Sequence, residues 1–248
     1  MSDQDYNEAT YGDNIAGIYD EWYPEPPADM IRALKDLART GPALELGIGT
    51  GRVALPLLLG GLEIHGIDAS EAMVAKLKSR PGGDRIPVTI GNFAEVGVDG
   101  TYSLIFVVFN TFFSLLTQEE QVNCFANIAG RLQPEGLFVM EAFIPDPSRF
   151  TQGQITKVTD ISAGEVRLEV SKHDSLQQRT MSHHLVITEA GIKLYPVQVR
   201  YAWPAELDLM ARLAGMRLRD RWSNWRRAPL AKDSPGHISI YELANPAR

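Results

Sequence analysis

The segment that most constrains the fold is LELGIGTGR, at residues 44–52, which stands between a short apolar run and a helical pattern. Glycines at such a junction let the backbone turn tightly and approach a ligand without a Cβ in the way. The same order of apolar run and helical pattern repeats through residue 143, as in βαβ units around a parallel sheet. The segment therefore predicts an α/β domain with a ligand site at its first turn.

The repeated pattern places the individual strands and helices. We expect strands at residues 43–46, 62–67, 86–90, 102–109 and 136–143, with helices at 28–37, 51–59, 70–79 and 118–132. The run at 102–109 is almost wholly apolar, which is typical of a strand covered on both faces. A helix at 204–214 and strands at 216–222 and 237–243 close the chain.

After residue 145 the pattern changes to an alternation of polar and apolar residues. Segments 165–173, 180–188 and 192–201 alternate in this way and are joined by short links. A period of two with short links predicts an antiparallel meander. We therefore expect an α/β fold with an inserted antiparallel β meander at about residues 151–202.

An aromatic leader precedes this domain. Tyr11, Ile15, Tyr19 and Tyr23 recur every four residues, as they would on one face of a helix. Prolines in segment 24–27 then stop the helical pattern. We expect residues 1–26 to form a lid segment over a domain of residues 27–248.

Charge and cysteine content exclude several classes of partner. The net charge is −7, and no stretch concentrates Lys and Arg enough to neutralise a row of phosphates, so we expect no nucleic acid partner. Arginines interleaved with tryptophans in segment 217–227 suggest base stacking, but they fit the solvent face of a half-buried strand better. A single cysteine precludes an internal disulfide. With no signal-like start and no long apolar run, a cytoplasmic protein without a membrane partner is expected.

The glycine segment also resembles a dinucleotide-binding fingerprint, which would indicate a nicotinamide-dependent oxidoreductase. That fingerprint needs a third glycine for close packing of helix and strand, and Arg52 stands at this position. The spacing is instead acidic-x-G-x-G-x-G, with Glu45 two residues before the first glycine. A carboxylate suits a ligand that presents a cation and disfavours a pyrophosphate. The oxidoreductase stays open as an alternative.

From about residue 11 to residue 143 the chain resembles the class I S-adenosylmethionine-dependent methyltransferases, whose first motif has this form. The resemblance implies a Rossmann-like seven-stranded sheet, mostly parallel with an antiparallel last strand. It also implies S-adenosylmethionine as cofactor, with its methionine part bordered by Glu45, Gly47, Gly49 and Gly51. Members of this family act on N or O of an acceptor, and we expect a small-molecule acceptor, in keeping with natural-product biosynthesis. A non-catalytic S-adenosylmethionine-binding protein stays open as a second alternative.

The ends of the next strands supply further cofactor candidates. Asp68 follows the glycine loop by about 20 residues, a spacing that places a carboxylate on ribose hydroxyls, although Asp68 also fits a helix cap. The resemblance implies that Ala69 lies beside it, that Met73 covers the adenine, and that Asn92 and Phe93 contact the adenine where the family often has an Asp. Asn110 ends the fourth strand and is expected to face the cofactor or the acceptor.

The acceptor site is predicted from two segments. Residues 19–23 read Y-D-x-x-Y, which resembles a segment in small-molecule members such as the antibiotic-sugar N,N-dimethyltransferases. By this resemblance Tyr19 covers the cofactor and takes part in catalysis. The remaining expected acceptor contacts, each with packing as its alternative, are Tyr11, Tyr23, Phe113, Arg200, Tyr201 and Trp203.

Two side chains are candidates for handling the acceptor's proton. Glu141, at the end of the fifth strand, is expected to orient an amine or hydroxyl. His184 is our candidate base, because histidine titrates near neutral pH and adjacent His183 and His184 cannot both face inward. The sugar N-methyltransferases have a histidine after the fourth strand, where this chain has Ser114. No compact cluster of carboxylates or histidines appears, so we predict a metal-independent enzyme and leave a homodimer open.

Overall fold

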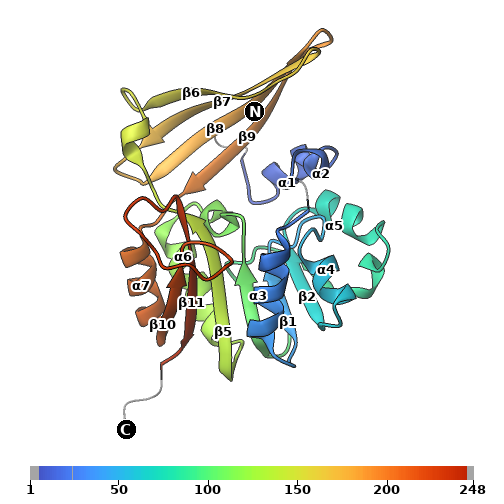
Figure 1. The fold of residues 1–248 in the computed structure, drawn as a ribbon, viewed down its shortest axis with the longest axis vertical. Helices are drawn as coiled ribbons and strands as arrows, with labels where there is room; N and C mark the ends of the chain where they lie inside the picture. Colours follow the sequence, from blue (N-terminus) through green and yellow to red (C-terminus); the bar gives the residue numbers. More distant parts are fainter. Residues whose placement is uncertain (1–5, 24, 245–248) are drawn as a thin grey trace.

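The computed structural model describes residues 6–23 and 25–244, and it contains two β-sheets (Figure 1). The larger sheet has seven strands in the order β10-β11-β5-β4-β1-β2-β3. Residues 1–5 of the predicted lid, and residue 24 within it, lie outside the described residues. The seven strands are β1 (Ala43–Leu46), β2 (Ile64–Asp68), β3 (Val88–Ile90), β4 (Tyr102–Val107), β5 (Leu132–Phe143), β10 (Met216–Trp222) and β11 (Gly236–Leu243).

Strand direction in this sheet agrees with the prediction. β1 pairs in parallel with β2 and β4, and the outer pairs β2 with β3 and β4 with β5 are also parallel. β11 runs antiparallel to both of its neighbours, β5 and β10. The mostly parallel sheet with an antiparallel last strand is therefore confirmed.

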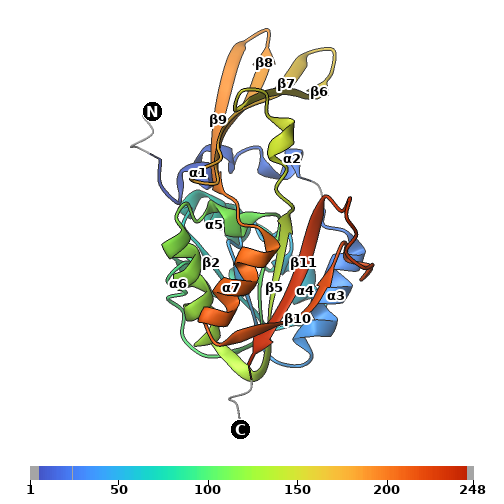
Figure 2. The ribbon, with the colours of Figure 1, turned by 90° about the vertical axis from the view of Figure 1, so that its left-hand side faces the viewer.

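Helices cover both faces of the large sheet (Figure 2). α6 (Gln118–Ala129) and α7 (Pro204–Leu213) lie on one face, where Phe125 packs against Phe138 and Tyr241. α3 (Ala28–Ala38) and α4 (Ala54–Leu59) lie on the other face, where their buried leucines pack with apolar side chains of the strands. α5 (Glu71–Lys78) follows β2. Within residues 6–23 and 25–244, no helix is both long and apolar enough to cross a lipid bilayer.

The second sheet has four antiparallel strands in the order β6-β7-β8-β9, and it stands beyond the carboxyl ends of the central strands (Figure 1). Three of its strands match the predicted meander: β7 (Glu165–Asp174), β8 (Arg179–Thr188) and β9 (Gly191–Arg200). The first strand, β6 (Gln154–Ile161), was missed. All but one of its residues are exposed, because it is an edge strand, and so its sequence carries little alternation.

The two faces of the second sheet differ in an unusual way. Strand register places Arg167, Glu169, Ser182 and His184 on the face that looks toward the rest of the molecule. The opposite face carries two rows of aliphatic side chains that each cross all four strands. The rows are Ile161, Val166, Ile187 and Ile192, and Val158, Leu168, Leu185 and Leu194. The inward face thus carries polar side chains, whereas two aliphatic rows are turned outward.

The leader forms two short helices, α1 (Thr10–Ile15) and α2 (Tyr19–Trp22), where the spacing suggested one. Ile15 is fully buried and packs with Met73 of α5. Figure 1 shows both helices between the second sheet and α5. The leader therefore lies over the carboxyl edge of the large sheet, where its aromatic side chains border the interior.

Candidate functional site

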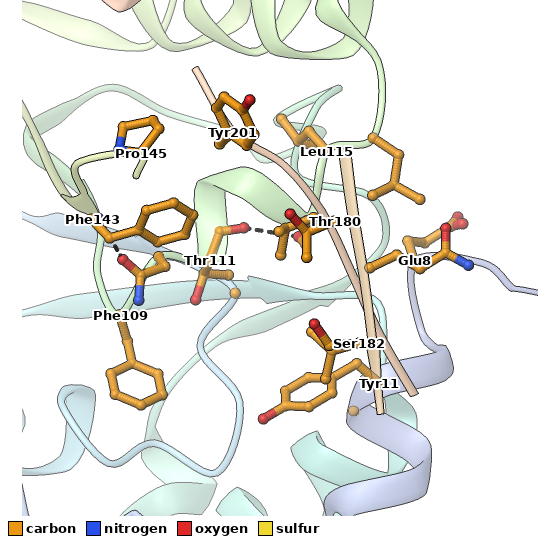
Figure 3. Close-up of a pocket in the computed structure, with 18 of the residues that line it drawn as sticks. Glu8, Tyr11, Phe109, Thr111, Leu115, Phe143, Pro145, Thr180, Ser182 and Tyr201 are labelled. Carbon is orange, nitrogen blue, oxygen red and sulfur yellow. Dashed lines mark hydrogen bonds between the residues drawn. The ribbon is translucent and has the colours of Figure 1, made fainter. Parts of the chain in front are cut away.

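A cavity of about 1170 Å³ lies between the carboxyl ends of the central strands, the leader and the second sheet (Figure 3). Its lining runs from Gly47, Gly49 and Asp68 at one end to Tyr201 and Trp203 at the other. A recess of about 30 Å³ adjoins it and shares Tyr19, Gly47 and Gly49 with its lining. Both ends of the predicted site thus belong to one cavity.

The three motif glycines all have positive φ, but they serve different purposes. A Cβ on Gly47 would meet the Thr111 side chain at 2.5 Å, and one on Gly51 would meet Leu77 at 2.3 Å. A Cβ on Gly49, whose φ is +56°, would meet nothing within 4 Å. Gly47 and Gly51 therefore allow close packing, whereas Gly49 leaves open space at the cavity wall.

Asp68 joins the glycine turn to the start of α5. Its carboxylate accepts hydrogen bonds from the backbone amide of Gly49, at 2.7 Å, and from that of Ser70, at 2.9 Å. Burial raises the pKa of Asp68, and these backbone hydrogen bonds oppose the shift. Asp68 lines the cavity, so it both holds the turn and offers an acceptor to a ligand. The cap of α5 comes from the Ser70 hydroxyl instead.

Glu45 is a buried carboxylate beneath the same turn. It is 3% exposed, and its Oε2 atom has no hydrogen-bond partner among the described residues. Burial raises the pKa of Glu45 well above its ordinary value, although the Arg52 charge acts in the opposite direction. An unpartnered buried carboxylate oxygen is costly, and a cation placed beside it would offset that cost.

The four residues predicted to lie beside the adenine end of the cofactor border a common cavity. Ala69, Met73, Asn92 and Phe93 all line the cavity. The Asn92 side chain accepts a hydrogen bond from the amide of Ala94 at 2.8 Å. That bond fixes the turn after β3 and leaves the Asn92 amide nitrogen available to a ligand.

The leader is fastened over the cavity by two carboxylates. Asp13 accepts a hydrogen bond from the Ser70 hydroxyl at 2.6 Å, and Asp20 accepts one from the Thr50 hydroxyl at 2.7 Å. Asp20 also pairs with Arg80. Sequence reasoning missed these contacts, because they depend on how the two short helices of the leader pack against the glycine turn and α5.

Tyr19 lies at the centre of this cover. It lines both the cavity and the adjoining recess. Burial raises the pKa of Tyr19 to about 12, with the Arg52 charge lowering it. The Tyr19 hydroxyl is therefore protonated at neutral pH and can donate a hydrogen bond. Its ring packs against Tyr23, whose ring in turn meets Phe109 edge-on at 4.8 Å.

A strained turn after β4 forms another part of the wall. Phe109 and Asn110 both have left-handed backbones, with φ of 59° and 64°, which costs non-glycine residues energy. This turn ends β4 two residues earlier than predicted. Glu141 holds it, since its carboxylate accepts hydrogen bonds from the Phe109 amide and from Trp225 Nε1, both at 2.9 Å. Glu141 is not in the cavity lining, so it supports the wall where we expected it to orient an acceptor.

Several other predicted residues lie away from the cavity. The ring of His184 packs edge-on against Trp22 of the leader and does not line the cavity. Burial lowers the pKa of His184. Phe113 is fully buried between Phe112 and Phe143. Arg200 is 5% exposed and pairs with Glu206. The predicted residues absent from the cavity lining are Tyr23, Glu45, Gly51, Phe113, Glu141, His184 and Arg200, of which Glu45 lines the recess.

The cavity wall also contains residues that the sequence did not single out. His173 and Phe150 line it and stack on each other at 4.7 Å. His173 ends a predicted strand, but only the register of the second sheet shows that it faces inward. Within the described residues, no group of three or more His, Cys, Asp or Glu side chains is arranged to hold a metal ion.

Comparison with known proteins gives consistent matches. Residues 43–136 match the family described as "Methyltransferase domain". The structure of the CcbJ methyltransferase from Streptomyces caelestis is 42% identical, with a TM-score of 0.90 over 97% of this chain and 100% of that one. The cypemycin N-terminal methyltransferase of a Streptomyces species is 28% identical over 70% of this chain and 71% of its own length. CalS10, an amino pentose methyltransferase from Micromonospora echinaspora, shares the fold, with a TM-score of 0.63 at 20% identity over 96% and 92% of the two chains.

Proposed function

The chain belongs to the class I S-adenosylmethionine-dependent methyltransferases, and from that premise we propose that it methylates a nitrogen atom of a small-molecule amine. The observation that carries this proposal is the charge of the cavity beyond the glycine turn. Carboxylates there outnumber basic side chains, and such a lining favours a cationic acceptor. The carboxylates are Glu8, Glu120, Asp146, Glu169 and Asp233, and the basic side chains are Arg149 and Lys232.

The residues at the glycine turn fit the cofactor. Glu45 offers an unpartnered buried oxygen to the methionine ammonium group, and Asp68 offers an acceptor to ribose hydroxyls. Gly49 leaves the space that the methionine part needs. Ala69, Met73, Asn92 and Phe93 remain our candidates for the adenine, and Asn110 for the end nearest the acceptor. The bound cofactor supplies an electrophilic methyl group on sulfur.

The chain's own residues then have four tasks. The cavity aligns the acceptor nitrogen with the methyl carbon, and the leader excludes water while it does so. The acidic lining attracts a protonated amine, which gives its proton to solvent water before the leader excludes water and the nitrogen lone pair attacks. The aromatic ring of Tyr19 can stabilise a nearby sulfonium through cation–π attraction. The name of the cypemycin N-terminal methyltransferase supports nitrogen as the acceptor atom in a similar chain.

Turnover with matched acceptors tests the proposal. The protein is incubated with S-adenosylmethionine and pairs of amines and phenols of equal carbon skeleton, and S-adenosylhomocysteine release is measured. We expect the amines to be methylated and the matched phenols to be inert. Methylation of phenols alone would overturn nitrogen as the acceptor atom. The methyltransferase matches already decide against the nicotinamide-dependent alternative and the non-catalytic one.

Trp225 provides a first mutational prediction. Trp225→Phe keeps a buried ring but removes the hydrogen bond to Glu141 that supports the strained turn. We expect about a fivefold lower kcat, as for the loss of one hydrogen bond, with little change in the KM for S-adenosylmethionine. Trp222→Phe is the matched control, because Trp222 is equally buried and its Nε1 donates to Asp220, away from the cavity. Equal losses of kcat in both variants would contradict the supporting role.

A homodimer is also proposed, on the apolar outer face of the second sheet. Val158, Ile161, Ile192 and Leu194 are 52–71% exposed on that face. An antiparallel sheet normally turns its polar face to water, and apolar faces of this kind mark interaction sites. Two copies of the same apolar face can pack together as in a β-sandwich, with twofold symmetry. A second copy of this chain therefore suits the face.

Light scattering after gel filtration tests the dimer. We expect a dimer for the wild-type chain and a monomer for Leu194→Glu, because a carboxylate would be buried in the apolar interface. Leu176→Glu should remain a dimer, since Leu176 is 91% exposed in the turn between β7 and β8, outside the two rows. A monomeric wild-type chain, or a dimer that Leu194→Glu leaves intact, would contradict this interface.

A further inference from the structure

Four aromatic rings form a continuous row of contacts along the cavity wall, and three of them are stacked. Phe150 and His173 stack with centroids 4.7 Å apart, and His173 and Tyr201 stack at 5.7 Å. Trp203 meets Tyr201 edge-on at 6.4 Å. The four residues come from the loop after β5, from β7 and from the segment after β9, and all of them line the cavity.

The stack fixes the imidazole of His173 in one orientation. The rings of Phe150 and Tyr201 lie nearly parallel to it, with interplanar angles of 18° and 25°. Its Nε2 atom lies 2.9 Å from the Tyr201 hydroxyl, and its backbone amide donates to Gly153. Within residues 6–23 and 25–244, no protein group is hydrogen bonded to Nδ1. His173 therefore presents one prepared polar edge, and a prepared edge costs little to order when a ligand binds.

Hydroxyl groups continue this polar edge along the second sheet. Thr180 is the direct register partner of His173, and Ser182 pairs with Ser171 through their hydroxyls at 2.7 Å. Thr180 and Ser182 are 8% and 7% exposed, yet they line the cavity. Figure 3 shows both of them between Tyr201 and Tyr11. Buried polar groups on a cavity wall need hydrogen-bond partners, which a polar ligand would supply.

We propose that this wall is the subsite that recognises a hydroxyl group on the ring of the acceptor, with His173 and Tyr201 as its specificity-determining pair. The proposal rests on the proposed function, which places the acceptor at this end of the cavity. His173 and Tyr201 can exchange the donor and acceptor roles in their shared hydrogen bond, because imidazole has two tautomers. The pair can thus donate to a ligand hydroxyl or accept from it.

The subsite predicts selectivity for acceptor rings that carry a hydroxyl group. A site built to hydrogen-bond a hydroxyl discriminates strongly against an analogue that lacks it, because its own polar groups are then left unpaired. A ring without the hydroxyl would leave Nδ1 of His173 and the nearby threonine without partners. We therefore expect cyclic amines with a hydroxyl to bind better than the same amines without one.

A variant that keeps the stack but removes its polar edge tests the subsite. His173→Phe preserves a ring between Phe150 and Tyr201 and removes both ring nitrogens. The affinities of aminocyclohexanol and cyclohexylamine are measured by calorimetry or ligand-observed NMR, with S-adenosylhomocysteine bound. We expect the hydroxyl to favour binding to the wild-type protein and this preference to fall roughly tenfold in His173→Phe. Tyr201→Phe should lower the preference in the same direction.

His184→Phe is the matched control, because His184 lies on the same sheet face but packs against Trp22 outside the cavity lining. It should keep the wild-type preference. The subsite is overturned if the wild-type protein shows no preference or binds neither amine, or if His173→Phe retains the preference while binding S-adenosylhomocysteine normally. Since these are binding measurements, they are separate from the proposed function, which fails instead if no amine is methylated.

Discussion

Gly49→Arg is expected to remove measurable binding of S-adenosylmethionine from a protein that still folds. The new side chain would enter the open space at the cavity wall, since a Cβ at this position meets no atom within 4 Å. The backbone there has a φ of +56°, so a non-glycine residue also costs roughly 1–2 kcal/mol of stability. Calorimetry should show at least about a hundredfold weaker binding, because the methionine part and the arginine cannot share the same space.

Gly61→Arg separates the loss of space from the backbone strain. Gly61 has a φ of +88° and equally open surroundings, but it lies in the turn after α4, outside the cavity lining. This control should lose a similar amount of stability and bind S-adenosylmethionine as the wild-type protein does. If Gly49→Arg binds the cofactor normally, the glycine turn does not border the ligand.

Glu45→Gln is expected to stabilise the unliganded protein and to weaken cofactor binding. Burial without a partner for Oε2 makes the Glu45 carboxylate unfavourable in the folded state. A neutral amide avoids this cost, and we expect a gain of about 1–3 kcal/mol in the free energy of unfolding at neutral pH. The same charge favours the methionine ammonium group, so its removal should weaken binding about 10-fold to 100-fold.

The difference in unfolding free energy between wild type and Glu45→Gln should depend on pH in a definite direction. Because the folded-state pKa of Glu45 is raised, the folded protein binds the proton more tightly than the unfolded chain. Its contribution to stability is therefore present at acid pH and is lost as the pH rises from the ordinary Glu pKa toward the raised value. Chemical unfolding of wild type and Glu45→Gln across that range should show a difference that grows with pH.

Glu206→Gln is the contrasting control. Burial acts to raise the pKa of Glu206, but hydrogen bonds from Arg200, Gln178 and Gln118 outweigh it and lower the pKa. Neutralising this carboxylate should therefore reduce stability and leave cofactor affinity unchanged. If Glu45→Gln also destabilises the unliganded protein, the Glu45 carboxylate is not held at a cost in the folded state.

That the proposed cofactor residues gather at one edge of the large sheet was predictable, because the signals for their positions are local. The turn at residues 47–51 depends on glycines that are adjacent in the sequence, and Asp68 ends the neighbouring strand. Parallel strands bring their carboxyl ends to one edge, so the position of each residue on its strand was enough to place it. The antiparallel last strand was expected from the family resemblance, whereas the order of the strands was not predicted from the sequence.

The acceptor end depends on contacts between distant segments, and here the sequence was less informative. Arg200 follows an alternating strand and looked exposed to a ligand, but Glu206 and Gln121 bind its guanidinium group inside the protein. His173 and His184 lie on the same face of the second sheet, and their difference depends on where the leader packs. Glu141 supports a turn whose two left-handed residues are not glycines, so the sequence did not indicate the turn. Only tertiary packing decides these cases.

A crystal structure with S-adenosylhomocysteine is the most direct test of the central claim, that one cavity grips the cofactor at the glycine turn and opens from its sulfur toward the second sheet. We expect the amino group at Glu45, the ribose hydroxyls at Asp68 and the sulfur facing the part of the cavity that Tyr19 and Asn110 border. A ligand bound elsewhere, or one whose sulfur faces away from the wall formed by His173 and Tyr201, would contradict the account.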